Sequence, residues 1–344
     1  MINRRTVIAG LGAAMTPLPG AGWTASATPS GKPARLRSGD TVGLVAPAGF
    51  VADRFGVEEV SETVRAMGLV PKPAPHLLER YGYLAGEDPV RAADLNEMFA
   101  DRSVQAILAV RGGWGCARIL PYLDFDLIGR NPKLLAGSSD ITALHMALSA
   151  KAGIPSIHGP NAAHSWSAMS WQSFRRLVFD AGTPTYGSAE PREDRLARRN
   201  WRIRTFRPGR AKGRLLGGNL SVLSALVGTP YLPDFDGAIL FLEDTNEAEY
   251  RIDRMLTQLA QSGILGRVAG VVFGQCTNCR NPGSNYGNFT IYEVLDQHFA
   301  RLGVPAFQGA LIGHIANQIS LPVGVMAEID ATEGTISILE SCVT

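Results

Sequence analysis

The sequence predicts an α/β protein with a parallel-sheet N-terminal domain and a smaller, β-rich α/β C-terminal domain. Apolar runs of strand length alternate with capped or amphipathic helical segments, which favours parallel strands covered by helices on both faces. The 344 residues exceed one average domain. An Arg- and Pro-rich stretch also interrupts the alternation between residues 182 and 212. Two domains on one chain follow from these observations.

Strands and helices of the first half can be assigned from local signals. Thr41–Ala46 is an apolar strand, and Asp53 caps a helix that ends at Gly68. Asp88 and Pro89 begin another helix, and Val104–Val110 is a buried strand. The elements expected next are a strand at Leu134–Ala136, a helix capped by Ser138, Ser139 and Asp140 that runs to Ala150, and a strand at Ile154–Ile157.

The expected domains are residues 28–181 for the N-terminal domain, 182–212 for a linker with a strand or two, and 213–344 for the C-terminal domain. The linker's arginines suggest a solvated face. The C-terminal domain is expected to contain Gly217–Ser221 leading into a helix to Val227, a strand at Ala238–Leu242, a helix at Glu247–Gln261, and a strand at Val268–Phe273.

Residues 1–27 have the pattern of a twin-arginine export signal. Arg4 and Arg5 precede a weakly apolar run, and Ala25–Ala27 offers a cleavage site, although a disordered basic start would look similar. The signal predicts a periplasmic protein without a membrane anchor, because no apolar run is long enough to span a bilayer. A net charge of +2 gives no support for a nucleic-acid partner.

The most informative turn is R-G-G-W-G-C-A at Arg111–Ala117, directly after the Val104–Val110 strand. Its glycines permit a sharp reversal, and a short helix follows. We therefore expect a nucleophile elbow that presents Cys116 at a helix N-terminus, where a thiolate is favoured. A packing cysteine in a Gly-rich turn would explain the same residues.

A cysteine nucleophile needs a base and a group that orients the base. His314 is the candidate base because it lies in the polar loop Gly313–Gln318, and Glu243 follows an apolar strand. The expected oxyanion hole is formed by the amides of Gly112, Gly113 and Ala117. Candidate substrate-binding residues are Arg111, Trp114, Ser139, Asp140 and Asn219, although Asp140 could equally be a helix cap.

Four sequence blocks together resemble the LD-carboxypeptidase family of serine peptidases, which includes the microcin-immunity peptidases. They are G-L-V-A-P-A-G at Gly43–Gly49, R-G-G-W-G-C-A-R-I-L-P-Y-L-D at Arg111–Asp124, G-G-N-L-S with F-L-E-D…Y-R-I-D-R-M-L up to Leu256, and G-H-I-A-N-Q-I-S-L-P-V-G at Gly313–Gly324. The blocks occur in family order across nearly the whole mature chain.

The resemblance implies a serine, histidine and glutamate triad, which carried across becomes Cys116, His314 and Glu243. It also implies release of a terminal D-amino acid from peptidoglycan tetrapeptides through an acyl-enzyme, no metal or cofactor, and a homodimer. This chain differs from that picture in two respects: cysteine occupies the assigned nucleophile position, and the chain carries an export signal although family members are commonly cytoplasmic. A cysteine triad is chemically sound because sulfur is the stronger nucleophile.

Two other functions stay open from the sequence. The chain could be an inactive homologue that binds muropeptides, or a thiol acyltransferase or amidase on the same scaffold. The C-T-N-C segment at Cys276–Cys279 is expected to hold a local disulfide or two unpaired thiols, since suitable partners for a zinc site are lacking nearby.

Overall fold

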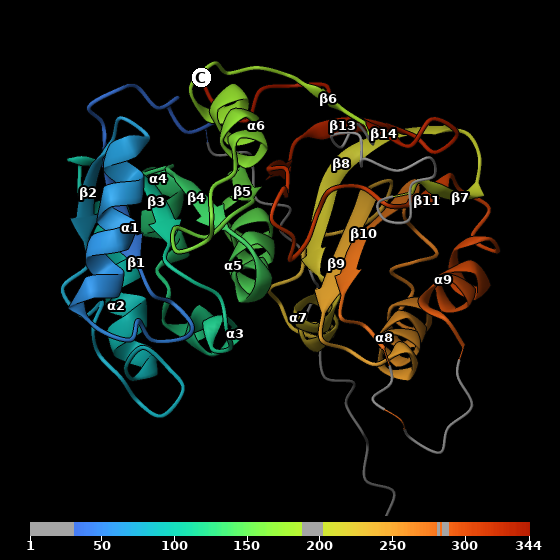
Figure 1. The fold of residues 1–344 in the computed structure, drawn as a ribbon, viewed down its shortest axis with the longest axis horizontal. Helices are drawn as coiled ribbons and strands as arrows, with labels where there is room; N and C mark the ends of the chain where they lie inside the picture. Colours follow the sequence, from blue (N-terminus) through green and yellow to red (C-terminus); the bar gives the residue numbers. More distant parts are fainter. Residues whose placement is uncertain (1–30, 188–201, 281–282, 284–288) are drawn as a thin grey trace, which may run out of the picture.

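The computed structural model describes residues 31–187, 202–280, 283 and 289–344. The predicted export signal therefore lies outside the described residues. In the described parts no helix is long and apolar enough to cross a membrane. Two sheets lie side by side, with the N-terminal sheet on the left in Figure 1 and the C-terminal sheet on the right. The α/β fold with a β-rich second half is as predicted.

The first sheet has the strand order β12-β5-β4-β3-β1-β2, and β1 to β5 are parallel. Its antiparallel edge strand, β12, comes from the C-terminal part of the chain and pairs with β5. The strands are β1 (Thr41–Val45), β2 (Val70–Pro73), β3 (Val104–Ala109), β4 (Leu134–Gly137), β5 (Ser156–His158) and β12 (Leu321–Val323).

The second sheet has the order β6-β14-β13-β8-β9-β10-β11-β7, with a parallel centre from β8 to β11. Strands β6 and β7 and the start of β8 lie within the stretch predicted as a linker. The strands are β6 (Thr185–Tyr186), β7 (Arg204–Arg207), β8 (Arg210–Asn219), β9 (Ile239–Thr245), β10 (Gly270–Thr277), β11 (Ala306–Gln308), β13 (Met326–Asp330) and β14 (Thr335–Ile338).

Helices cover the sheets, and α5 and α7 lie in the central layer between them (Figure 1). Asp53 caps α1 as predicted, because its carboxylate accepts from the amides of Phe55 and Gly56. The helical segments are α1 (Arg54–Ala66), α2 (Asp88–Ala100), α3 (Cys116–Ile119), η1 (Leu120–Tyr122), α4 (Phe125–Arg130), η2 (Ser139–Ile141), α5 (Thr142–Ala147), η3 (Leu148–Ala152), α6 (Ala168–Val178), α7 (Leu220–Ala225), α8 (Glu249–Gln261) and α9 (Ile291–Phe299).

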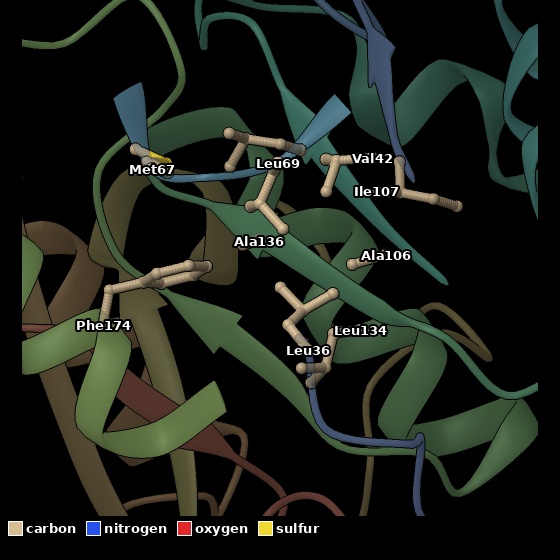
Figure 2. Close-up of a pocket in the computed structure, with 10 residues that line it drawn as sticks. Leu36, Val42, Met67, Leu69, Ala106, Ile107, Leu134, Ala136 and Phe174 are labelled. Carbon is tan, nitrogen blue, oxygen red and sulfur yellow. The ribbon is translucent and has the colours of Figure 1, made fainter. Parts of the chain in front are cut away.

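One apolar core runs through both sheets and fixes the strand ends that carry polar groups. Figure 2 shows a pocket between the first sheet and α6 that is lined by apolar side chains. It is lined by Leu36, Val42, Met67, Leu69, Ala106, Ile107, Leu108, Leu134, Ala136 and Phe174. These side chains supply neither a base nor a nucleophile, so the chemistry must lie elsewhere.

Candidate active site

A histidine and a glutamate from the second half of the chain form a close pair. His314 Nδ1 lies 2.8 Å from Glu243 Oε2. Glu243 is fully buried near the end of β9, whereas about 30% of the His314 side chain is exposed. Within the described residues, Nε2 of His314 has no hydrogen-bond partner. The pair therefore has the geometry of an oriented general base whose second nitrogen faces the site.

The charges around His314 favour its protonated form. Burial lowers the pKa of His314, but the hydrogen bond and charge of Glu243 and the charge of Asp244 outweigh that effect and raise it. Burial and the neighbouring charge of Glu243 raise the pKa of Asp244 to about 6. An imidazolium formed during proton transfer is therefore stabilised beside two carboxyl groups.

Asn219 orients this acidic pair from the end of β8. Its amide nitrogen donates to Glu243 Oε1 and to Asp244 Oδ1, both at 3.2 Å. Its side-chain oxygen accepts from the amide of Val222 and caps α7. Asn219 was predicted to bind substrate, and in the structure it is buried with both ends of its side chain hydrogen-bonded. It supports the glutamate here, and its role toward substrate stays a prediction.

Cys116 lies at the first position of α3, as predicted. It is fully buried, and its amide donates to Asp140 Oδ2 at 2.7 Å. Burial, followed by the charge and hydrogen bond of Asp140, raises the pKa of the Cys116 thiol well above its usual value. These surroundings favour the neutral thiol, and the role of Cys116 as nucleophile stays a prediction.

Asp140 and Arg91 hold the glycine-rich turn from two sides. Asp140 is buried and binds the Cys116 amide, while buried Arg91 donates to the carbonyl of Gly115 at 3.0 Å. Asp140, predicted to bind substrate, is therefore occupied in shaping this turn. Arg111 and Trp114 stay at the surface of the same turn, where Arg111 donates to the carbonyl of Phe50.

The strained turn of the site follows β4, at Ser139. Ser139 has φ +63°, a left-handed conformation that is unusual for a residue other than glycine, between a buried strand and a helical segment. The side chain is partly exposed, and its hydroxyl has no hydrogen-bond partner within the described residues. This strand, strained serine and helix have the form of a nucleophile elbow.

Gly112 lies directly against this serine. A Cβ atom added at Gly112 would lie 2.8 Å from Ser139 Cβ and 3.1 Å from Ser139 Oγ. The glycine-rich turn therefore contributes backbone beside the hydroxyl. Of the predicted oxyanion-hole residues, Gly113 packs against Gly49, and Ala117 follows the buried Cys116 on α3. Gly112 is the one of the three whose contact with Ser139 is direct.

Several contacts join the Ser139 turn to the histidine and glutamate. The side chain of Asn161 accepts from the amide of Ser138 at 3.1 Å, and His164 Nε2 lies 3.2 Å from the carbonyl oxygen of Ile315, beside His314. From the other side, the Asn219 amide donates to Thr142 Oγ1 at 2.9 Å. The two halves of the chain thus meet at one polar site between the sheets.

Ser139 was predicted to bind substrate, and the structure places it at the turn after β4, beside Gly112. Gly137, Ser138 and Ser139 follow the buried strand at Leu134–Ala136, so small residues stand at the carboxyl end of a parallel strand. The role of Ser139 in substrate binding stays a prediction. Among the described residues, no group of three or more metal-ligating side chains is present.

Two protein-family descriptions match this chain, one over its N-terminal half and the other over its C-terminal half. The LD-carboxypeptidase N-terminal domain matches residues 42–159, and the LD-carboxypeptidase C-terminal domain matches residues 212–329. A probable murein peptide carboxypeptidase of Bacillus subtilis is 36% identical over 309 residues, which cover 88% of this chain and 93% of that protein.

Solved structures extend the similarity to the whole fold. The microcin C7 self-immunity protein MccF has a TM-score of 0.81 at 25% identity, covering 91% of this chain and 99% of its own. One MccF structure is described as an active-site mutant in which a serine, an asparagine and a lysine are replaced by alanine. A muramoyltetrapeptide carboxypeptidase from Oxalobacter formigenes has a TM-score of 0.74 at 28% identity, covering 87% and 97% of the two chains.

Proposed function

This chain belongs to the LD-carboxypeptidase family, and we propose that it hydrolyses the L,D amide bond before the terminal D-amino acid of peptidoglycan-derived peptides. The substrate class is the one for which the Bacillus and Oxalobacter relatives are named. The family resemblance seen in the sequence is confirmed by these matches.

We propose Cys116 as the nucleophile, with His314 as the base and Glu243 as the group that orients the base. Cys116 follows the glycine-rich turn after β3 and is the first residue of α3. The serine and the asparagine replaced in the MccF active-site mutant stand 102 positions apart, and Cys116 and Asn219 stand 103 positions apart here. Ser139 and Asn219 are separated by only 80 positions, so that spacing supports the cysteine. The enclosed thiol must become accessible when substrate binds.

The reaction then follows the logic of a cysteine peptidase. His314 Nε2 takes the Cys116 proton while Glu243 holds Nδ1, and Cys116 Sγ attacks the carbonyl carbon of the L,D amide. The amide of Ala117, directly after the nucleophile, and the amides of Gly112 and Gly113 stabilise the oxyanion. The imidazolium gives its proton to the leaving D-amino acid, and water then hydrolyses the thioester on Cys116.

The deciding experiment is mass spectrometry of a disaccharide tetrapeptide incubated with wild type, Ser139→Ala and Cys116→Ala. Wild type should release terminal D-alanine, and Ser139→Ala should retain part of that activity. Cys116→Ala should lose about 10⁴-fold or more in kcat, because the acyl-enzyme cannot form. Thermal melts of all three proteins separate loss of chemistry from loss of fold.

Two results would overturn the assignment. Full activity in a folded Cys116→Ala together with loss in Ser139→Ala would assign the nucleophile to the serine. If wild type does not cleave the muropeptide, the proposed substrate is wrong. Aspartyl sulfamoyl adenosine, a ligand of MccF, would then be the next compound to test.

The burial of Cys116 favours one second candidate, an inactive homologue that binds muropeptides. Such a protein should bind the tetrapeptide without turnover, both as wild type and as Cys116→Ala. A thiol acyltransferase would instead give a new product when amine acceptors are added.

A further inference from the structure

The segment C-T-N-C at Cys276–Cys279 lies beside the candidate base and is not used by the reaction described above. Its two cysteines form a disulfide with a Cα–Cα distance of 5.4 Å. Cys276 and Thr277 end β10 and pair with Asp244 and Thr245, the two residues that follow Glu243 on β9. The disulfide therefore closes a turn at the same sheet edge as the glutamate.

Thr277 connects this turn to the histidine loop. Its hydroxyl donates to the carbonyl oxygen of His314 at 3.0 Å. Two residues earlier, Gln275 binds the same loop twice, through its amide to the Ile312 carbonyl at 2.8 Å and through its side chain to the Ala310 carbonyl at 3.1 Å. The end of β10 thus holds the loop, and Thr277 is the contact made at His314 itself.

The disulfide closes a turn whose backbone conformation is unfavourable. Asn278, between the cysteines, has φ +57°, and its side chain donates to the side-chain oxygen of Asn246, which has φ +58°. Left-handed conformations cost free energy even for asparagine. A closed disulfide across Asn278 restricts relaxation of this turn, so it also restricts movement of Thr277.

We propose that Thr277 is a positioning residue for His314, and that the Cys276–Cys279 disulfide makes the rate of the proposed reaction sensitive to redox state. A dithiol reductant supplies two electrons and two protons: the Cys276–Cys279 bond breaks, both sulfurs become thiols, and the reductant closes to its own disulfide. The turn then relaxes, and His314 loses its fixed position beside Glu243. This inference rests on the proposed function for its kinetic test.

The first test compares Thr277→Val, Thr277→Ser and wild type, with Thr229→Val as a matched control. Thr229 also donates its hydroxyl to a carbonyl, that of Leu226, at the end of α7. Thr277→Val should lower kcat by about 10- to 100-fold with little change in KM, because catalytic groups lose alignment. Thr277→Ser keeps the hydroxyl and should restore most of the rate, and Thr229→Val should behave as wild type.

The second test changes the disulfide. Reducing wild type with dithiothreitol, with two freed thiols counted by alkylation and mass spectrometry, should lower kcat to a similar extent. The double variant Cys276→Ser with Cys279→Ser should show this loss permanently and should not respond to reductant. Cys116 and Cys342 are already free and buried, so they do not contribute to the change.

A readout independent of turnover separates this inference from the proposed function. The His314 ring signal, assigned by its loss in His314→Asn, is titrated by NMR in the oxidised and the reduced protein. Oxidised wild type should titrate at higher pH than Thr277→Val or the reduced protein, since both weaken the contact with Glu243. Identical titrations, or an unchanged rate after confirmed reduction, would overturn the inference even if wild type is an active peptidase.

Discussion

At the scale of single residues, the site is organised around two adjacent buried carboxyl groups. Glu243 and Asp244 share the Asn219 amide, and Asp244 also accepts from the amide and the hydroxyl of Ser221, each at 2.9 Å. Buried carboxylates without donors are costly, so these contacts are needed for folding as well as for function. They leave Oε2 of Glu243 directed at His314.

Glu243→Gln should change the pH dependence of the reaction. The raised pKa of His314 depends on the hydrogen bond and charge of Glu243, so neutralising this residue should lower that pKa. The reaction needs neutral His314, so kcat/KM rises with pH through the pKa of this residue, above about 6.5 in wild type. In Glu243→Gln, the rise of kcat/KM with pH should occur at lower pH than in wild type. The maximum value of kcat/KM at high pH should fall by up to about 10⁴-fold.

The control for this prediction is Glu58→Gln, which removes an exposed carboxylate on α1. Its pH profile should overlie that of wild type. If kcat/KM of Glu243→Gln rises at the same pH as that of wild type, a group other than His314 determines the pH dependence. Profiles are measured as initial rates of D-alanine release from pH 5 to 9.

The sequence predicts all three proposed triad residues, because each occupies a distinctive local setting. Glu243 ends an apolar strand, His314 stands between polar residues and glycine, and Cys116 follows a glycine-rich turn. The burial of the thiol and the left-handed φ angle at Ser139 depend on packing, which local sequence does not contain. Local sequence therefore indicates which side chains can react, and packing determines their exposure.

At the scale of elements, a close approach between β8 and α5 joins the two halves of the site. Gly218 on β8 has φ +145°, and a Cβ there would lie 2.4 Å from Thr142 Oγ1 and 2.7 Å from Thr142 Cγ2. The next residue, Asn219, donates its amide to the same hydroxyl. The absence of a side chain at Gly218 therefore lets the Ser139 turn and Glu243 occupy one site.

Gly218→Ala should destabilise the protein and reduce its activity. The new methyl group meets Thr142, and alanine must adopt a left-handed backbone, so the free energy of unfolding should fall by about 2–5 kcal/mol. Urea unfolding measures the loss. Gly129→Ala is the matched control, because this glycine of α4 has open space around it and should be neutral or slightly stabilising.

A Gly218→Ala protein as stable as the control would show that β8 can move away from α5 at little cost. In that case its kcat becomes the informative quantity. A stable variant with a large loss of kcat would still indicate that the spacing between the sheets sets the catalytic geometry.

Local patterns predict the central strands well and the sheet edges poorly. The apolar runs at Thr41–Ala46 and Val104–Val110 are the strands β1 and β3. Strand β2 has the sequence V-P-K-P, whose prolines disfavour a strand assignment, and it forms an edge where prolines are tolerated. Strand β12 joins the sheet of the other half of the chain, which no local signal can indicate.

At the scale of the whole molecule, the proposed triad is assembled from both halves of the chain. Cys116 follows β3 of the first sheet, whereas Glu243 and His314 come from the second half. Strand β12 pairs with β5 only seven residues after His314, so the histidine loop is tied to both sheets. Relative movement of the sheets is therefore coupled to the catalytic geometry. The homodimer implied by the family resemblance stays a prediction.

The compartment of the protein bears on the disulfide at Cys276–Cys279. Disulfides are rare in the reducing cytoplasm and form readily in an oxidising periplasm. Residues 1–27 have the sequence pattern of a twin-arginine signal, and we propose that the chain is exported folded by that route. Export and disulfide formation are consistent with each other, since an exported chain meets the oxidant that closes the turn beside His314.

Arg4→Lys combined with Arg5→Lys should block export of the full chain, because the arginine pair is read by the export receptor. Cell fractionation should find the variant as uncleaved precursor in the cytoplasm, with Cys276 and Cys279 open to maleimide after denaturation. The control, Arg35→Lys with Arg37→Lys, makes the same change beyond the signal and should be exported with the pair oxidised. Export of the first variant would instead assign residues 1–27 to the general secretion route. A cytoplasmic variant with the disulfide already closed would show that the folded turn, rather than the compartment, determines oxidation.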